Sequence, residues 1–103
     1  MPRATENDVA LAVLQIATAQ AKGICTFNRA CSEVPNYVAF EAADLQGSVT
    51  RPGEPMWHQL IRNIKSHHTA EGNFIAEGYL QHVPRRGYRA TPAGRAYLKK
   101  LGL

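Results

Sequence analysis

Apolar residues recur every three or four positions through the first part of the chain, which is the spacing of a helix face. Thr5 followed by Asp8 has the pattern of an N-cap with an acidic residue in the first turn. A helix is therefore predicted over about 6–22, and Gly23 provides its stop. The apolar positions that support it are Val9, Ala12, Val13, Leu14, Ile16 and Ala17.

The next segments are short and are interrupted by a proline. Residues 24–26 (Ile-Cys-Thr) favour a β-strand, and residues 27–34 predict a second, short helix. Pro35 ends this helix because the residue before a proline resists helical geometry. Residues 35–53 are the least regular part of the chain, although FEAADL (40–45) could supply a helical turn.

Helical spacing returns after this irregular segment. Pro55 suits a first helical position, and a third helix is predicted over about 55–67. Gly72 breaks the pattern, and a short helix over about 73–77 is expected to end at Gly78. The core-facing stripe of the third helix is expected to consist of Trp57, Leu60, Ile61 and Ile64, which fall within about 100° of arc.

From Tyr79 the pattern changes to that of strands. Residues 79–83 and 88–91 predict two strands joined by Pro84-Arg85-Arg86-Gly87, with Gly87 as the left-handed residue of the turn. Thr91-Pro92 then predicts the N-cap and first turn of a last helix over about 92–101. The residues of this helix expected to face inward are Ala93, Tyr97, Leu98 and Leu101.

The order of elements predicts an α+β fold that is mostly helical. A three-helix core, a β-hairpin and a C-terminal helix are typical of a winged helix-turn-helix, in which the hairpin is the wing. With 103 residues, the chain has the length of one domain, so residues 1–103 are expected to form a single winged-helix domain.

Charge separates the two halves of the chain. Residues 1–54 hold four of the 12 basic and six of the eight acidic side chains, and residues 55–103 hold the rest. No acidic residue follows Gly78, whereas six basic ones do. This asymmetry favours a polyanionic partner for the second half, against the alternative of a basic surface that only aids solubility.

The polar face of the third helix contains the residue types that read DNA, and none of its residues carries a carboxylate. Glutamine and asparagine pair with adenine, arginine pairs with guanine, and serine and lysine suit phosphates. We therefore predict that this helix faces DNA rather than only water. The candidate residues are His58, Gln59, Arg62, Asn63, Lys65 and Ser66.

The predicted wing adds three arginines. Arg85 and Arg86 at the tip could reach a phosphate or enter a narrow minor groove, and Arg89 follows on the next strand. Hairpin tips are polar in any case, but the neighbouring acid-free helix face favours DNA contact by these residues.

The segment GYLQHVPRRGYRATPAGRAYL (78–98) resembles the wing and following helix of many bacterial winged-helix DNA-binding domains. More of the chain resembles the N-terminal winged-helix domain of Mrr-type restriction endonucleases. The matching elements are the entry at 21–24, Asp44-Leu45, Arg62-Asn63 and the wing exit at 86–94. Because the sequence ends at Leu103, we expect no endonuclease domain, and the insertion at 69–73 departs from the family pattern. The resemblance therefore implies DNA binding and not cleavage.

Catalytic and metal-binding patterns are missing from the sequence. Cys25 and Cys31 are too far apart for most structural zinc sites, and the side chains of the adjacent His67 and His68 diverge on a helix. The acidic residues are scattered, so a metal-dependent nuclease is not expected. We expect no enzyme activity, no catalytic residue, no metal, no cofactor and no small-molecule ligand. No apolar stretch approaches the ~18 residues of a membrane span, and a cytoplasmic location is expected.

These observations predict a stand-alone double-stranded DNA-binding protein. The third helix is expected in the major groove, with the arginine-rich wing on the backbone or in the minor groove. A transcriptional regulator and a restriction- or phage-associated module both fit, and homodimerisation stays open. The alternative is a winged-helix adaptor that binds a protein partner, through Tyr37, Phe40 and the irregular segment, or that dimerises without binding DNA.

Overall fold

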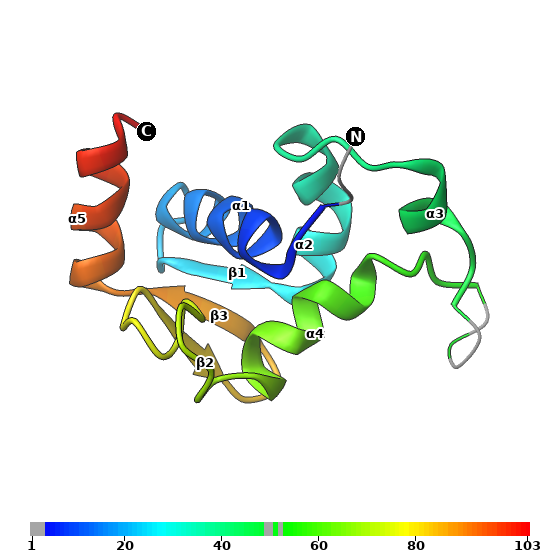
Figure 1. The fold of residues 1–103 in the computed structure, drawn as a ribbon. Helices are drawn as coiled ribbons and strands as arrows, with labels where there is room; N and C mark the ends of the chain where they lie inside the picture. The colour runs from blue at the N-terminus through cyan, green and yellow to red at the C-terminus, as the bar shows by residue number, and fades with distance from the viewer. Residues whose placement is uncertain (1–3, 49–50, 52) are drawn as a thin grey trace.

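The computed structural model describes residues 4–48, 51 and 53–103. The irregular segment expected over 35–53 therefore lies partly outside the described residues, at 49, 50 and 52. Across the described residues the fold is α+β, with five α-helices around a three-stranded antiparallel sheet (Figure 1). The elements are α1 (Glu6–Thr18), β1 (Ile24–Thr26), α2 (Phe27–Glu33), the 3-10 helix η1 (Val34–Asn36), α3 (Ala42–Leu45), α4 (His58–Ser66), β2 (Leu80–Val83), β3 (Gly87–Ala90) and α5 (Pro92–Leu101).

Helix α1 crosses the middle of the molecule above the sheet. Helices α2 and α3 lie toward one end of α1 and α5 lies toward the other, while α4 runs below α1 beside the hairpin (Figure 1). Val9, Val13 and Ile16 have no exposed surface, because both the sheet and α4 pack against α1. None of the helices in the described part of the chain is long and apolar enough to span a bilayer.

The first two helices are confirmed but end earlier than expected. Helix α1 stops at Thr18 rather than near residue 22, because the Thr18 hydroxyl and the Gln20 amide donate to carbonyls of its last turn, at 2.8 and 2.9 Å. The chain then turns to reach Gly23 (φ 70°). Helix α2 ends at Glu33, and Pro35 lies within the 3-10 turn that continues it.

The third helix was expected from Pro55, but α4 begins at His58. Pro55 instead pairs with Gly47 in an isolated antiparallel bridge. The Met56 N–H donates to the Gln46 carbonyl at 2.8 Å, which holds the chain away from helical geometry. The helical turn expected in FEAADL is present as α3.

The prediction of a short helix over 73–77 is wrong. The buried Asn73 side chain instead accepts hydrogen bonds from backbone N–H groups of this segment. Its Oδ1 accepts hydrogen bonds from the N–H groups of Ile75 and Ala76, at 2.7 and 3.2 Å. Its Nδ2 donates to the Ile64 carbonyl and to the Glu6 carboxylate, at 2.9 and 3.2 Å. This side chain therefore links the end of α4 to the start of α1.

The sheet has the order β1-β3-β2, so the second strand of the hairpin lies in the middle. Gly87 is needed because a Cβ there would lie 2.1 Å from the Cys25 carbonyl oxygen, and its φ of 153° is rarely adopted by other residues. The expectation that Gly87 is the left-handed residue of the turn is wrong. Arg85 holds that conformation, with φ 65°.

Helix α5 has the expected bounds but a different inner face. Gly94 and Leu98 are buried, whereas Ala93 and Leu101, which were expected to face inward, are exposed. The reason is a close approach: a Cβ at position 94 would lie 2.2 Å from the Tyr79 carbonyl oxygen. Tyr97, half-buried, stacks on Tyr79 with ring centroids 4.2 Å apart.

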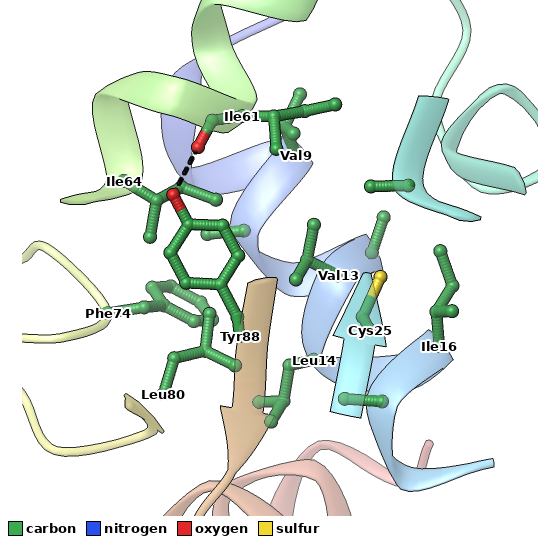
Figure 2. Packing of buried hydrophobic residues seen from close by; sticks show 14 of the residues in the cluster. Val9, Val13, Leu14, Ile16, Cys25, Ile61, Ile64, Phe74, Leu80 and Tyr88 are labelled. Carbon is green, nitrogen blue, oxygen red and sulfur yellow. Dashed lines mark hydrogen bonds between the residues drawn. The ribbon is translucent and has the colours of Figure 1, made fainter. Parts of the chain in front are cut away.

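A tyrosine joins the hairpin to α4. Figure 2 shows Tyr88 reaching from β3 toward α4, where its hydroxyl donates to the Ile61 carbonyl at 2.6 Å. Trp57, Ile61 and Ile64 of the expected stripe are buried and Leu60 is half-buried. Burial raises the pKa of the Tyr88 hydroxyl to about 12. The contact therefore sets the hairpin beside the polar face of α4.

We expect Tyr88→Phe to lower the free energy of unfolding by about 1 kcal/mol at pH 7, because one buried hydrogen bond is lost. The folded pKa lies above the unfolded value of 10.0, so Tyr88 stabilises the fold below pH 10 and loses this contribution as the pH rises to about 12. Between pH 10 and about 12, the free energy of unfolding of the original protein falls by up to ~1.4 kcal/mol per pH unit more than that of the variant. Urea unfolding at pH 7 and pH 11 measures both effects. Equal losses in the two proteins would contradict the burial of this hydroxyl.

Candidate functional site

Two basic hollows lie on either side of the hairpin tip, residues 84–86. The first, here called the α4 groove, has a volume of about 400 Å³ and lies between α4 and the hairpin. Its polar walls come from Arg62, Lys65 and Ser66 of α4, from Arg85 and Arg86 of the tip, and from His82 of β2. Five of the residues expected to contact DNA therefore share one concavity, and no carboxylate among the described residues lines it.

The second, here called the β1 hollow, has a volume of about 670 Å³ and lies between the tip and the start of α2. Arg85 and Arg86 line it too, together with Lys22, Asn28 and Arg29. Sequence reasoning missed these last three residues. They lie in the turn after α1 and in the first turn of α2, so no periodic pattern connects them to the hairpin.

The backbone holds the tip in position between the two hollows. The Phe27 N–H donates to the Arg86 carbonyl at 3.2 Å, and the Arg86 N–H donates to the Val83 carbonyl at 3.0 Å. Both tip arginines are exposed. Within the described part of the chain, neither forms an ion pair, so their charges are available to an anion.

Arg62, unlike the two tip arginines, forms an ion pair. Its Nη2 donates to both carboxylate oxygens of Glu54, at 2.8 and 2.9 Å, and its guanidinium lies 4.7 Å from the centre of the Phe27 ring. The hydrogen bond from Arg62 lowers the pKa of the Glu54 carboxyl, which therefore stays charged at neutral pH. Although α4 itself carries no carboxylate, the preceding segment brings one to its polar face.

Gln59 and Asn63 lie on α4 but outside the α4 groove. The Gln59 amide donates to the Asn63 side-chain oxygen at 2.9 Å. Gln59 also borders a separate, more apolar hollow with Met56 and Leu60. The two amides therefore extend the polar face of α4 away from the hairpin.

His58 and Arg89 are placed differently from the other expected contacts. His58 is half-buried, with Nδ1 3.6 Å from Cys31 Sγ and its ring 6.3 Å from that of Phe27. Burial lowers the pKa of His58, which favours its neutral form. Arg89 is exposed on the outer face of the sheet, where it pairs in register with Ile24 and Gln81. Neither residue lines the α4 groove or the β1 hollow.

Among the described residues, the titratable side chains do not gather into a site for a metal. The described residues contain no group of three or more histidine, cysteine, aspartate or glutamate side chains that could hold one. His67 instead contacts Glu6, with Nδ1 2.6 Å from the carboxylate, and His68 Nδ1 lies 2.9 Å from the Lys65 carbonyl.

The two thiols have environments that disfavour the nucleophilic thiolate. Burial raises the pKa of the Cys25 thiol to about 12, and burial also raises that of Cys31. A thiol in such an environment remains protonated and acts as a small apolar group.

We therefore expect both thiols to react at least about tenfold more slowly with an aromatic disulfide reagent at pH 8 in the folded protein than in urea. Cys31→Ala assigns the remaining signal to Cys25. A thiol that reacts in the folded protein as fast as in urea would contradict these environments.

No model of a known protein family matches the chain, and neither a curated protein nor a solved structure matches it. What the chain does is therefore inferred from the charges and positions of the residues around the hairpin tip.

Proposed function

We propose that this chain is a winged-helix protein that binds double-stranded DNA in the cytoplasm. The order of helices and strands supports a winged helix-turn-helix, with α4 as the recognition helix and the β2–β3 hairpin as the wing. In this assignment α4 enters the major groove, which is wide enough to admit an α-helix. The tip of the wing lies on the adjacent backbone or in the minor groove.

The observation that carries the proposal is the shared lining of the α4 groove. Arg62 and Lys65 come from the helix, Arg85 and Arg86 come from the tip, and all four reach the same concavity. A duplex places its phosphates on both sides of an inserted helix, so cations from two neighbouring elements suit a single backbone. A surface that served only solubility does not require these cations to face one hollow.

The β1 hollow extends the proposed contact along the backbone. Lys22 and Asn28 lie on the far side of the tip from α4, and their side chains can donate to phosphate oxygens. In this assignment Arg85 and Arg86 meet the backbone between two positively charged hollows. In the same assignment Gln59 and Asn63, which extend the polar face of α4, contact base edges, whereas nothing in the groove supports a contact by His58 or Arg89.

A protein-binding adaptor is the second candidate, and the exposed apolar residues of 37–56 favour it. Tyr37, Leu45 and Met56 expose 48%, 56% and 40% of their surfaces. Salt separates the two candidates. Four to six phosphate contacts give log K against log salt concentration a slope near −4 to −5, and a protein partner gives a much weaker dependence.

We expect Arg85→Ala with Arg86→Ala to weaken binding to all duplex sequences about equally and to flatten the salt slope by up to about two, because phosphate contacts carry no sequence information. Fluorescence anisotropy over a range of salt concentrations measures both quantities. The control is Lys99→Ala with Lys100→Ala, which removes the same charge from the exposed end of α5. Equal losses in the two double variants would contradict a role for the wing.

Lys22→Ala tests the β1 hollow separately. We expect weaker binding to any duplex and a salt slope flatter by about one, because one phosphate contact is lost. Lys99→Ala is the matched single-charge control. Unchanged affinity and slope for Lys22→Ala would restrict the interface to α4 and the tip.

A further inference from the structure

The pairing of Glu54 with Arg62 places a negative charge beside a groove whose lining is otherwise free of carboxylates. Glu54 precedes α4 and reaches across the first two turns of that helix. Only 21% of the Arg62 side chain is exposed, because Glu54 meets its edge and Phe27 lies against its face. Arg62 therefore contributes little net charge to the α4 groove in this state.

The geometry of the guanidinium makes this contact compete with other bidentate contacts. A guanidinium offers two planar edges for a bidentate contact, Nε with Nη2 and Nη1 with Nη2. Glu54 binds Nη2, the atom that both edges share, with both of its oxygens. Each Nη2 hydrogen belongs to one of these edges, so Arg62 cannot recognise guanine or a phosphate through the edge that Glu54 occupies unless Glu54 withdraws.

The position of Glu54 permits such an exchange. Its side chain is 30% exposed, and the residue lies outside regular secondary structure. Its backbone is held by two hydrogen bonds, from Ser48 N–H to the Glu54 carbonyl at 2.7 Å and from Glu54 N–H to the Arg51 carbonyl at 3.1 Å. A rotation of the side chain alone can release Arg62 while the backbone stays in place.

We propose that Glu54 competes with DNA for Arg62 and so limits the affinity of the α4 groove for DNA, an inference that rests on the proposed DNA-binding function. A carboxylate and a phosphate are similar acceptors for a guanidinium, so exchanging Glu54 for an arbitrary phosphate yields little net free energy. A base edge, whose acceptors carry no net charge, gains still less from the same exchange. Glu54 thereby lowers the affinity of the α4 groove for DNA.

The test compares Glu54→Gln with Glu71→Gln on a mixed-sequence duplex. Both variants remove one negative charge, but Glu71 is exposed in the turn after α4 and borders a different hollow, with Thr5 and Asn7. We expect Glu54→Gln to bind roughly three- to tenfold more tightly than Glu71→Gln at low salt, with a salt slope steeper by about one. Thermal unfolding of both variants confirms that each is folded.

A second pair of variants shows whether Glu54 acts through Arg62. In an Arg62→Gln background, we expect Glu54→Gln to add no more affinity than Glu71→Gln adds. A gain that persists without Arg62 would overturn the proposed competition, and so would a weaker binding of Glu54→Gln than of Glu71→Gln.

The inference and the underlying function fail in different ways. If the wing variant weakens binding while Glu54→Gln and Glu71→Gln behave alike, DNA binding stands and the role of Glu54 is overturned. If neither the original protein nor any of these variants binds the duplex with salt-dependent affinity, the proposed function itself is overturned.

Discussion

The contact between Tyr88 and α4 holds the two halves of the candidate interface together. Tyr88 lies on the central strand, its ring is buried, and its hydroxyl donates to a carbonyl of the helix. Together with the packing of α4 and β3 on α1, this contact holds the hairpin and α4 beside one groove. A second close approach, Gly87 against the Cys25 carbonyl, brings the same strand against β1 and so forms the β1 hollow on the other side of the tip.

Much of the fold could be predicted from the sequence because its determinants are local. Helix α5 has the expected bounds, since Thr91 caps it from a neighbouring position and Gly102 ends it in the left-handed conformation. The strands and the core stripe of α4 followed in the same way from alternation and helical spacing. The segment 73–77 could not be predicted, because Asn73 is held by Ile64 and Glu6, which are remote in the sequence. The same applies to the exposed Ala93, since the approach of α5 to Tyr79 decides which residues face inward.

The candidate site could likewise be predicted where its residues are close in the sequence, and not where packing brings remote residues together. A helical wheel identifies Arg62, Lys65 and Ser66 as neighbours, and the wing tip follows from the turn residues. The wheel contains only residues of the helix, however, so it does not include Glu54, which reaches α4 from the preceding segment. Lys22 and Arg29 were missed because only the packing of the hairpin against the start of α2 brings them to the tip. A helix face that has no acidic residue of its own can therefore still carry a negative charge from a neighbouring segment.

We propose that one basic surface, formed by α4 and the hairpin tip, binds the DNA backbone. A titration of the backbone amide NMR signals with a mixed-sequence duplex tests this most directly, because it reports every residue in the same experiment. We expect the perturbed signals to cluster at 58–66 and 84–87, with a second group at 20–29. Perturbation confined to 37–57, or its absence at low salt, would contradict it.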